Sequence, residues 1–199
     1  MFVDRQAAYR KAYLVQLLDR LCAELEITEA RREEAEQRYN GVAEWLSSGE
    51  HYLLHGLSIY LQGSTALGTT VRPIRSLEHD VDLVAFLPGG SRDLLPSYVK
   101  TVVGDRLKAN GHYLKLLEEK QRCWRLVYAN EFHLDITPAV LNTACWRGGE
   151  LVPDKTLRVW KETNPKGYRT AFEVRAALVP LVRVTKVIDV QVIDDARGH

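Results

Sequence analysis

The sequence predicts an α+β fold in which N-terminal helices pack against a mixed β-sheet. Apolar residues recur at helical spacing through the first 49 positions, which predicts two helices. Short runs rich in β-branched and aromatic residues follow between positions 58 and 137, and the last two are separated by only two residues. Such close spacing predicts a tight β-hairpin. With 199 residues, 46% of them hydrophobic, the chain can bury a substantial core.

The first predicted helix spans residues 4–26 and carries an apolar stripe made of Ala8, Tyr9, Ala12, Tyr13, Leu17, Leu21 and Leu25. Thr28 is a favourable N-cap for a second helix, which should end near Gly49. Charges of both signs are dense over residues 29–38, which indicates a solvated helix face with ion pairs one turn apart.

Strands and helices then alternate irregularly, which is typical of an α+β fold. A strand at Ser58–Leu61 precedes a Gly-Ser turn, and a second strand containing Asp80 and Asp82 ends at the turn of residues 88–91. The elements predicted next are a helix over Asp93–Asn110, closed by Gly111, and strands at Tyr113–Leu117, Arg122–Tyr128 and Glu131–Thr137.

The last part of the chain has a weaker pattern. Residues 142–165 show no strong periodicity, and residues 147–149 indicate a loop. Asn164 and Pro165 favour a helix start, as N-cap and first helical residue, and this helix should reach about Leu178. Residues 181–193 are β-branched and strand-like.

The stretch from Gln62 to Phe86 begins with a predicted phosphate-binding turn. Gly63, Ser64 and Thr65 follow a strand and open a short helical turn, so backbone N–H groups and two hydroxyls can converge on a phosphate. Glycine suits this position because a Cβ atom would obstruct close approach. We therefore predict nucleotide binding at Gly63, Ser64 and Thr65.

Three carboxylates predict a metal site. Asp80 and Asp82 are two residues apart in a strand, so they project from one face while His79 takes the other. Asp135 lies in the later hairpin strand, which should bring it beside the sheet edge that carries the first pair. Clustered carboxylates repel each other, and their hard oxygen atoms suit Mg²⁺ or Mn²⁺. Asp80, Asp82 and Asp135 are the predicted metal ligands and catalytic residues, whereas His79 and His133 should face opposite ways.

These motifs resemble the polymerase-beta nucleotidyltransferase superfamily. Within it the chain most resembles the CD-NTases, the bacterial relatives of cyclic GMP-AMP synthase and oligoadenylate synthase found in anti-phage CBASS systems. The resemblance covers roughly residues 5–170, and the segments that carry it are residues 62–73, 79–84, 122–126, 132–138 and 160–168.

The resemblance implies a polymerase-beta-like core and an enzyme that depends on Mg²⁺ or Mn²⁺. Its substrates would be nucleoside triphosphates, ATP first, with GTP, CTP and UTP as further candidates. The product would be a cyclic di- or trinucleotide, or a short oligonucleotide, that acts as a second messenger in anti-phage defence. Two alternatives stay open: nucleotidyl transfer to a small molecule or protein, and a truncated nucleotide-binding module without catalysis.

Three segments are expected. Residues 1–50 form an N-terminal helical segment that packs on the core, residues 51–165 form the catalytic core, and residues 166–199 form a short, divergent C-terminal segment. Proteins of the resembled family continue into a helical lobe that closes the nucleotide cleft, and this lobe is expected to be missing or divergent here. Lys166 and Tyr168 stand where the family begins the segment that leads to this lobe.

Composition excludes several other classes of function. The formal net charge of +1 gives no global attraction for nucleic acid, so a polymeric template is not expected. The three cysteines fit neither a zinc site nor a disulfide framework and indicate reduced thiols. No apolar run has the length of a signal peptide core or a membrane span, so we expect a cytoplasmic protein without a membrane partner. A homo-oligomer or a regulatory protein partner is compatible with the sequence.

Overall fold

A mixed seven-stranded sheet is the centre of the fold in the computed structural model, which describes residues 5–72, 79–128, 132–154, 156 and 158–178. The strands are β1 (Ser58–Leu61), β2 (His79–Phe86), β3 (Leu117–Glu119), β4 (Trp124–Tyr128), β5 (Phe132–Leu141), β6 (Glu150–Asp154) and β7 (Val159–Thr163). The main order is β1-β2-β5-β4-β3, and β6 pairs with both β5 and β7. Among the described strands, β2 and β5 form the one parallel pair. The α+β prediction with a mixed sheet is therefore confirmed.

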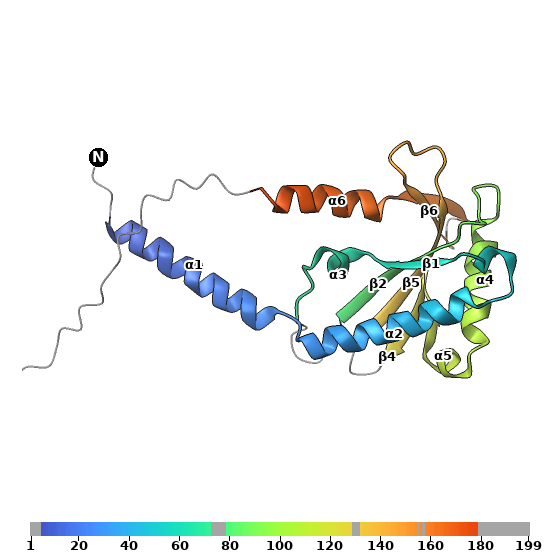
Figure 1. The fold of residues 1–199 in the computed structure, drawn as a ribbon, viewed down its shortest axis with the longest axis horizontal. Helices are drawn as coiled ribbons and strands as arrows, with labels where there is room; N and C mark the ends of the chain where they lie inside the picture. Colours follow the sequence, from blue (N-terminus) through green and yellow to red (C-terminus); the bar gives the residue numbers. More distant parts are fainter. Residues whose placement is uncertain (1–4, 73–78, 129–131, 155, 157, 179–199) are drawn as a thin grey trace, which may run out of the picture.

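The helices surround this sheet unevenly (Figure 1). They are α1 (Arg5–Leu25), α2 (Glu29–Ser47), α3 (Gly63–Leu67), α4 (Pro96–Lys108), α5 (Gly111–Leu116) and α6 (Pro165–Ala176), with a 3₁₀ turn η1 at Tyr52–Leu54. Within the described ranges, no helix combines the length and the apolarity needed to cross a bilayer.

The core lies between one face of the sheet and the helices α2 and α4. Burial alternates along β4 and along the first half of β5, so Leu126, Leu134 and Ile136 are fully buried while their neighbours in sequence are half-buried. These side chains join one cluster with apolar residues of α2 and α4. Trp45 of α2 and Arg106 of α4 connect the two helices, since each donates a side-chain hydrogen bond to the carbonyl of the other, at 2.8 and 2.9 Å.

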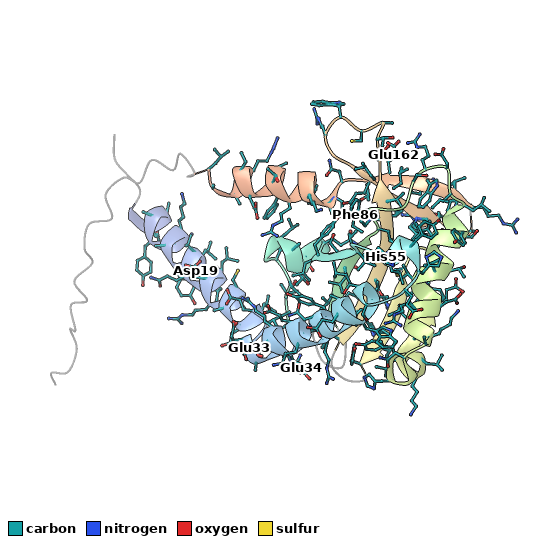
Figure 2. All side chains as sticks on the ribbon, turned by 45° about the vertical axis from the view of Figure 1, so that its right-hand side comes forward. Asp19, Glu33, Glu34, His55, Phe86 and Glu162 are labelled. Carbon is teal, nitrogen blue, oxygen red and sulfur yellow. The ribbon has the colours of Figure 1, made fainter. Side chains whose placement is uncertain are left out.

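The first two helices differ in how they meet the sheet. In α2, Ala35, Val42 and Leu46 are buried, so this helix packs on the core. In α1, every side chain from position 6 to 25 is exposed, including the predicted stripe, and Figures 1 and 2 show the helix projecting away from the sheet. The periodicity therefore predicted the α1 helix, but the stripe does not contribute to this core.

The solvated face predicted for α2 is present. Glu33 and Glu34 lie on the outer side of the helix, away from the sheet (Figure 2). Glu34 forms an i,i+4 ion pair with Arg38 at 3.6 Å, and both side chains are about two-fifths exposed. Such exposed pairs contribute little stability.

The strand predicted at Tyr113–Leu117 is wrong, because residues 111–116 form the helix α5. The Asn110 side chain accepts hydrogen bonds from the backbone N–H groups of His112 and Tyr113, which caps the new helix. Only Leu117 of the predicted strand remains extended, as the start of β3. A local cap therefore overrides the β propensity of this segment.

Two strands, β6 and β7, occur in the region where the sequence shows no strong periodicity. All five residues of β6 are buried, so the alternation that marks a half-exposed strand is missing. The predicted loop before β6 contains Gly148 with φ of 74°. The helix at Pro165 is confirmed, and the Asn164 side chain caps it by accepting from the Gly167 N–H. The predicted strand at residues 181–193 lies outside the described residues.

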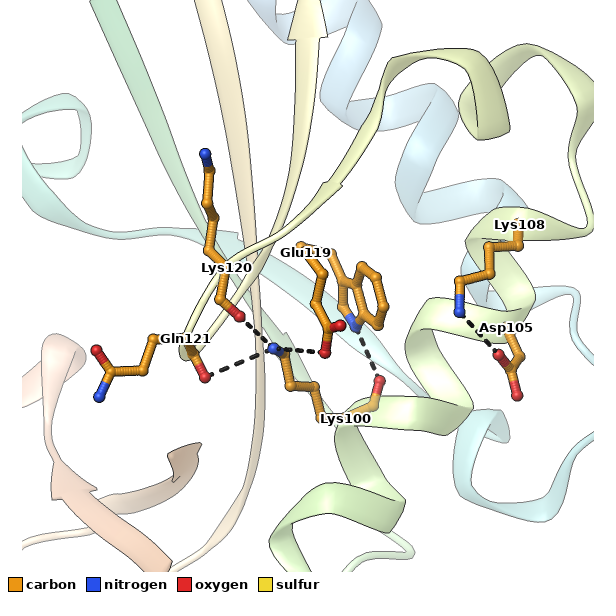
Figure 3. Close-up of polar contacts among 7 residues, drawn as sticks. Lys100, Asp105, Lys108, Glu119, Lys120 and Gln121 are labelled. Carbon is orange, nitrogen blue, oxygen red and sulfur yellow. Dashed lines mark hydrogen bonds and ion pairs between the residues drawn. The ribbon is translucent and has the colours of Figure 1, made fainter. Parts of the chain in front are cut away.

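A buried lysine ties α4 to the turn between β3 and β4 (Figure 3). Lys100 is 2% exposed, and its Nζ lies 3.1 Å from Glu119 Oε1 and 3.5 Å from the Gln121 carbonyl. Its Nζ also donates to the Lys120 carbonyl. The Trp124 indole N–H donates to the Lys100 carbonyl at 2.9 Å. One side chain thus satisfies a carboxylate and two backbone acceptors at the entry to β4.

Candidate active site

Four charged side chains occupy the sheet face opposite the helical core. In the parallel β2–β5 pair, Asp82 lies opposite Asp135, and Asp80 is two residues earlier on the same face of β2. In the antiparallel β4–β5 pair, Arg125 lies opposite Asp135. Cross-strand partners share a face, so Asp82, Asp135 and Arg125 form one row across three strands. The three predicted acids are brought together, although in the interior of the sheet and not at its edge.

Arg125 is a site residue that was not among the predicted site residues. Its Nε and Nη2 atoms contact the two carboxylate oxygens of Asp135 at 2.6 and 2.7 Å, in a bidentate fork. Its Nη2 also lies 3.2 Å from Asp80 Oδ1. These contacts, of which the hydrogen bond to Asp135 is the strongest, raise the pKa of the Arg125 guanidinium. The residue is therefore a permanent positive charge among the acids.

Asp82 lies outside the arginine fork and is held in an electrostatically unfavourable place. Burial raises the pKa of the Asp82 carboxyl, and the negative charges of Asp135 and Asp80 raise it further, while Arg125 partly offsets them. Uncompensated negative charge on one face is the condition under which a cation binds best. The donor set thus fits Mg²⁺ or Mn²⁺, which prefer carboxylate oxygens.

The side chains as they stand do not yet form a coordination shell. In the part of the chain that the structure describes, no group of three or more His, Cys, Asp or Glu side chains is arranged to hold one metal ion. The Arg125 fork accounts for this at Asp135, because both carboxylate oxygens are already engaged. His79 and His133 lie on opposite faces, as predicted, because His79 shares the buried face of β2 while His133 pairs with Asp80.

Asp82→Asn is expected to stabilise the metal-free protein at pH 7. Because the folded state raises the pKa of Asp82, it binds the Asp82 proton more tightly than the unfolded state does. The contribution of Asp82 to wild-type stability therefore rises as pH falls toward the ordinary pKa of 3.8, and the advantage of the variant shrinks there. The gain should be no more than about 1 kcal/mol, because the side chain is only partly buried. Thermal melts in EDTA at neutral and acidic pH measure this gain in stability, with a variant of an exposed acid, Asp105→Asn, as control. An Asp82→Asn protein less stable than wild type at pH 7 would contradict the raised pKa of Asp82.

The predicted phosphate-binding turn lies directly against Asp82. β1 pairs with β2 up to Leu61, and α3 begins two residues later at Gly63, whose φ is 63°. A Cβ atom on Gly63 would stand 2.4 Å from Asp82 Oδ2, so only glycine allows this approach. The turn is thereby fixed against the second of the three acids.

The hydroxyls of this turn form a small cluster. Thr70 Oγ1 lies 3.2 Å from Ser64 Oγ and 3.2 Å from Thr65 Oγ1. The Thr69 N–H donates to the Ser64 carbonyl at 2.9 Å, which folds the chain back over α3. Ser64 and Thr65 are thus held next to Gly63 on an exposed turn.

On the predicted role of this turn in phosphate binding, Gly63→Ala is expected to lower nucleotide affinity by about tenfold or more, because the added methyl group displaces Asp82. The left-handed backbone adds a stability loss of about 1 kcal/mol. Gly68→Ala is the matched control, since Gly68 has φ of 67° but a Cβ there meets nothing within 4 Å. Nucleotide titration and urea denaturation of both variants separate the two effects. Equal binding by both variants would mean that the close approach to Asp82 is unimportant.

A cavity of about 340 Å³ adjoins the turn. Gln62, Gly63 and Leu67 line it from the side of α3, and the start of α6 lines the other side with Asn164, Pro165, Tyr168 and Arg169. Tyr168 is 65% exposed and therefore available to a ligand. The volume lies within the range of small-molecule sites.

Lys166 is held by the protein itself. Its Nζ lies 4.1 Å from the ring centroid of Tyr60 and 3.8 Å from Glu150 Oε1. The Tyr60 hydroxyl donates to the other oxygen of Glu150, whose side chain is almost completely buried. Burial and this hydrogen bond raise the pKa of Tyr60. Lys166 therefore anchors α6 to β1 and β6.

The cysteines are free thiols. Cys22 is exposed, whereas Cys123 and Cys145 are half-buried. Burial, together with the negative charge of Asp135, raises the pKa of the Cys123 thiol to about 12. Cys123 thus stays protonated beside Asp135 at neutral pH.

The chain is similar to known proteins over most of its length. A family model described as the Second Messenger Oligonucleotide or Dinucleotide Synthetase domain (SMODS) matches residues 13–175. A c-di-GMP synthase from Roseivirga ehrenbergii is 30% identical over 163 residues, which cover 81% of this chain and 43% of that protein.

Solved structures show the same fold. The CD-NTase CdnG of Bradyrhizobium diazoefficiens, in complex with GTP, aligns with a TM-score of 0.63 and 24% identity, over 75% of this chain and 43% of that chain. The c-UMP-AMP synthase CdnE of Rhodothermus marinus, with Apcpp and Upnpp, aligns with a TM-score of 0.60 and 13% identity, over 77% of this chain and 57% of that chain. These alignments confirm the polymerase-beta-like fold class. The chain spans 43% of the length of the Roseivirga protein and 43% of the length of the CdnG chain.

Proposed function

We propose, from the premise that this chain belongs to the Second Messenger Oligonucleotide or Dinucleotide Synthetase family, that it carries the catalytic core of a nucleotidyltransferase. The observation that carries the proposal is the placement of Asp80, Asp82 and Asp135 on one open sheet face beside the Gly63 turn. This arrangement puts a cluster of negative charge next to a turn and a cavity that can take a nucleoside triphosphate.

The proposed reaction joins two nucleoside triphosphates. An acceptor hydroxyl oxygen attacks the α-phosphorus of the donor, its proton leaves, and the bond between the α-phosphorus and the pyrophosphate oxygen breaks. Repetition of this step gives a cyclic di- or trinucleotide or a short linear oligonucleotide. The reaction needs mainly positioning and charge neutralisation, because no covalent intermediate with the protein is required.

Different residues of the chain bind the donor and the acceptor nucleotide. The Gly63 backbone and the hydroxyls of Ser64 and Thr65 hold the donor phosphates, and the cavity between α3 and α6 takes the rest of the donor. Asp135, on the neighbouring strand, faces the acceptor hydroxyl. Close packing of Gly63 on Asp82 keeps the triphosphate next to the acids.

Asp80, Asp82 and Asp135 would hold the divalent cations of this site, Mg²⁺ or Mn²⁺. Bound there, such cations neutralise the charge of the triphosphate and lower the pKa of the acceptor hydroxyl. The partly uncompensated charge at Asp82 supports this assignment.

Three similar proteins support nucleoside triphosphates as substrates. The Roseivirga protein is a c-di-GMP synthase, and the CdnG and CdnE structures contain GTP or the analogues Apcpp and Upnpp. ATP, GTP, CTP and UTP are all candidate substrates for this chain.

The test is incubation of the purified chain with each radiolabelled nucleoside triphosphate and with all four, in Mg²⁺ or Mn²⁺. Phosphatase treatment followed by chromatography should reveal a phosphatase-resistant product. Parallel reactions with small-molecule and protein acceptors distinguish oligonucleotide synthesis from transfer to another acceptor. Absence of both product and cation-dependent nucleotide binding would refute the proposal.

The cellular role proposed is second-messenger synthesis in the cytoplasm during anti-phage defence, and it is supported by the resemblance to CD-NTases. Plaque counts on bacteria expressing the whole gene, compared with an Asp82→Ala version, test it. Equal phage resistance in both strains would favour a non-catalytic role.

A further inference from the structure

We propose that Arg125 is a built-in competitor of the divalent cation at Asp135 and Asp80, so that it lowers and sets the cation affinity of the site. The inference rests on the proposed function, because it assigns a role within the same group of acids. It concerns a residue outside the set of three acids and makes a prediction about binding that is independent of turnover.

The contacts of Arg125 make it a competitor. The fork to Asp135, at 2.6 and 2.7 Å, uses both carboxylate oxygens, and the contact to Asp80 Oδ1 is 3.2 Å. A cation bound by Asp135 uses the same two oxygens, and its positive charge repels the guanidinium beside it. The guanidinium should therefore give up at least part of its fork when Asp135 becomes a ligand.

The position of Arg125 shows that this pairing belongs to the site and not to the core. Its side chain is 22% exposed, that of Asp135 is 13% exposed and that of Asp80 is 53% exposed. The β4–β5 register places Arg125 directly opposite Asp135, on the open face. The next residues of β4 on either side, Trp124 and Leu126, are buried on the opposite face in the hydrophobic core.

The charges predict the direction of the effect. Three carboxylates and one guanidinium leave a formal charge of −2 (−3 + 1) at the site. Removing the guanidinium leaves −3 and frees both oxygens of Asp135, so cation binding becomes tighter. The metal-free fold becomes less stable, because the acids then repel each other without compensation. If Arg125 only positioned the acids, its removal would weaken cation binding, because the acids would lose their positions.

The first experiment measures Mn²⁺ dissociation constants from the EPR signal of free Mn²⁺, for wild type, Arg125→Gln and Arg125→Lys. We expect Arg125→Gln to bind Mn²⁺ roughly tenfold more tightly, which corresponds to about 1.4 kcal/mol. Arg125→Lys keeps the charge without the fork and should lie between the two. Arg38→Gln is the matched control: it removes the same charge from an exposed arginine of α2 whose partner is Glu34, at 3.6 Å, so its Mn²⁺ affinity should match wild type.

A double-mutant cycle locates the effect. In an Asp135→Asn background, Arg125→Gln should change Mn²⁺ affinity much less, because the main point of competition is gone. Unchanged or weaker Mn²⁺ binding by Arg125→Gln, with native circular dichroism, would overturn the inference while leaving the proposed function intact. If wild type itself binds no Mn²⁺, or binds it equally well without Asp82, the proposed cation site fails, and the inference fails with it.

A measurement on the wild-type protein covers the case in which Arg125→Gln does not fold. The Arg125 Nε–H resonance, assigned by comparison with Arg125→Lys, is followed during Mg²⁺ titration. A hydrogen bond to a carboxylate shifts this proton downfield, so we expect an upfield shift that saturates as Mg²⁺ binds. A resonance that stays in place at saturating Mg²⁺ would mean that the fork persists, and the inference would be rejected.

Discussion

Asp80→Ala combined with Asp82→Ala is expected to abolish product formation, with a loss of at least ~1000-fold. The two acids share the open face of β2, and Asp82 touches the Gly63 turn, so their removal eliminates most of the negative charge beside the donor phosphates. Arg125 keeps Asp135 in place, and the fold should persist. Nucleotide turnover and chromatography of labelled products measure the loss.

The control for this experiment is Asp105→Ala. Asp105 is an exposed acid on α4 that pairs with Lys108 at 3.3 Å, remote from the sheet face that carries the site. Its removal should leave turnover within about twofold of wild type, since exposed pairs contribute little. A double variant that still yields product, with its far-ultraviolet circular dichroism intact, would show that the catalytic acids lie elsewhere.

The sequence predicted that Asp80 and Asp82 share a face, because strand periodicity is local. Asp135 lies on the same face because β5 pairs with β2 in a register that sets Asp135 opposite Asp82. The parallel pairing of β2 with β5, and its interior place in the sheet, depend on contacts between segments about fifty residues apart. Local patterns do not determine such pairings, so the acids were expected at a sheet edge.

Arg125 was missed because of a difference of one residue in the hairpin. A two-residue turn at positions 129 and 130 would pair Tyr128 with Glu131 and place Arg125 opposite Leu134, on the core face. In the structure Tyr128 pairs with Phe132, which moves Arg125 opposite Asp135. A shift of one residue exchanges the two faces of a strand, so this site residue depends on register. Its sequence signals are a charged residue between the apolar Trp124 and Leu126 and its place in the segment 122–126, which carries part of the family resemblance.

The start of α6 was predicted from its cap, whereas its role in the site needed the structure. Asn164 and Pro165 are recognisable in sequence as a helix start. The cavity between α6 and α3 arises because Lys166 holds α6 against Tyr60 and Glu150, which come from distant strands. Such a three-way contact has no local pattern.

Lys100→Met is expected to lower the free energy of unfolding by about 3 kcal/mol. The 2%-exposed lysine donates to Glu119 and to the backbone carbonyls of Lys120 and Gln121. Methionine fills the same space but leaves the two carbonyls, which cannot be removed by mutation, without this donor. Urea denaturation monitored by tryptophan fluorescence measures the loss.

Lys108→Met is a closely matched control, because it also belongs to α4 and contacts the same aromatic ring. Its Nζ lies 4.8 Å from the Trp124 ring centroid, against 5.2 Å for Lys100, and it pairs with Asp105 at 3.3 Å (Figure 3). The Lys108 side chain is 45% exposed, so water can replace its contacts, and the expected loss is below about 1 kcal/mol.

The Lys100 effect should extend to the active site, because the turn that Lys100 holds leads directly into β4. Gln121 and Arg122 in this turn are also fixed, by hydrogen bonds of 3.0 and 3.1 Å to the fully buried Asp154. Loosening the turn would therefore move Arg125, three residues further along the chain. If Arg125 competes with the cation, Lys100→Met should tighten Mn²⁺ binding as well as lower stability, whereas Lys108→Met should change neither. A Lys100→Met protein as stable as Lys108→Met would mean that burial of this lysine contributes nothing beyond an ordinary surface pair.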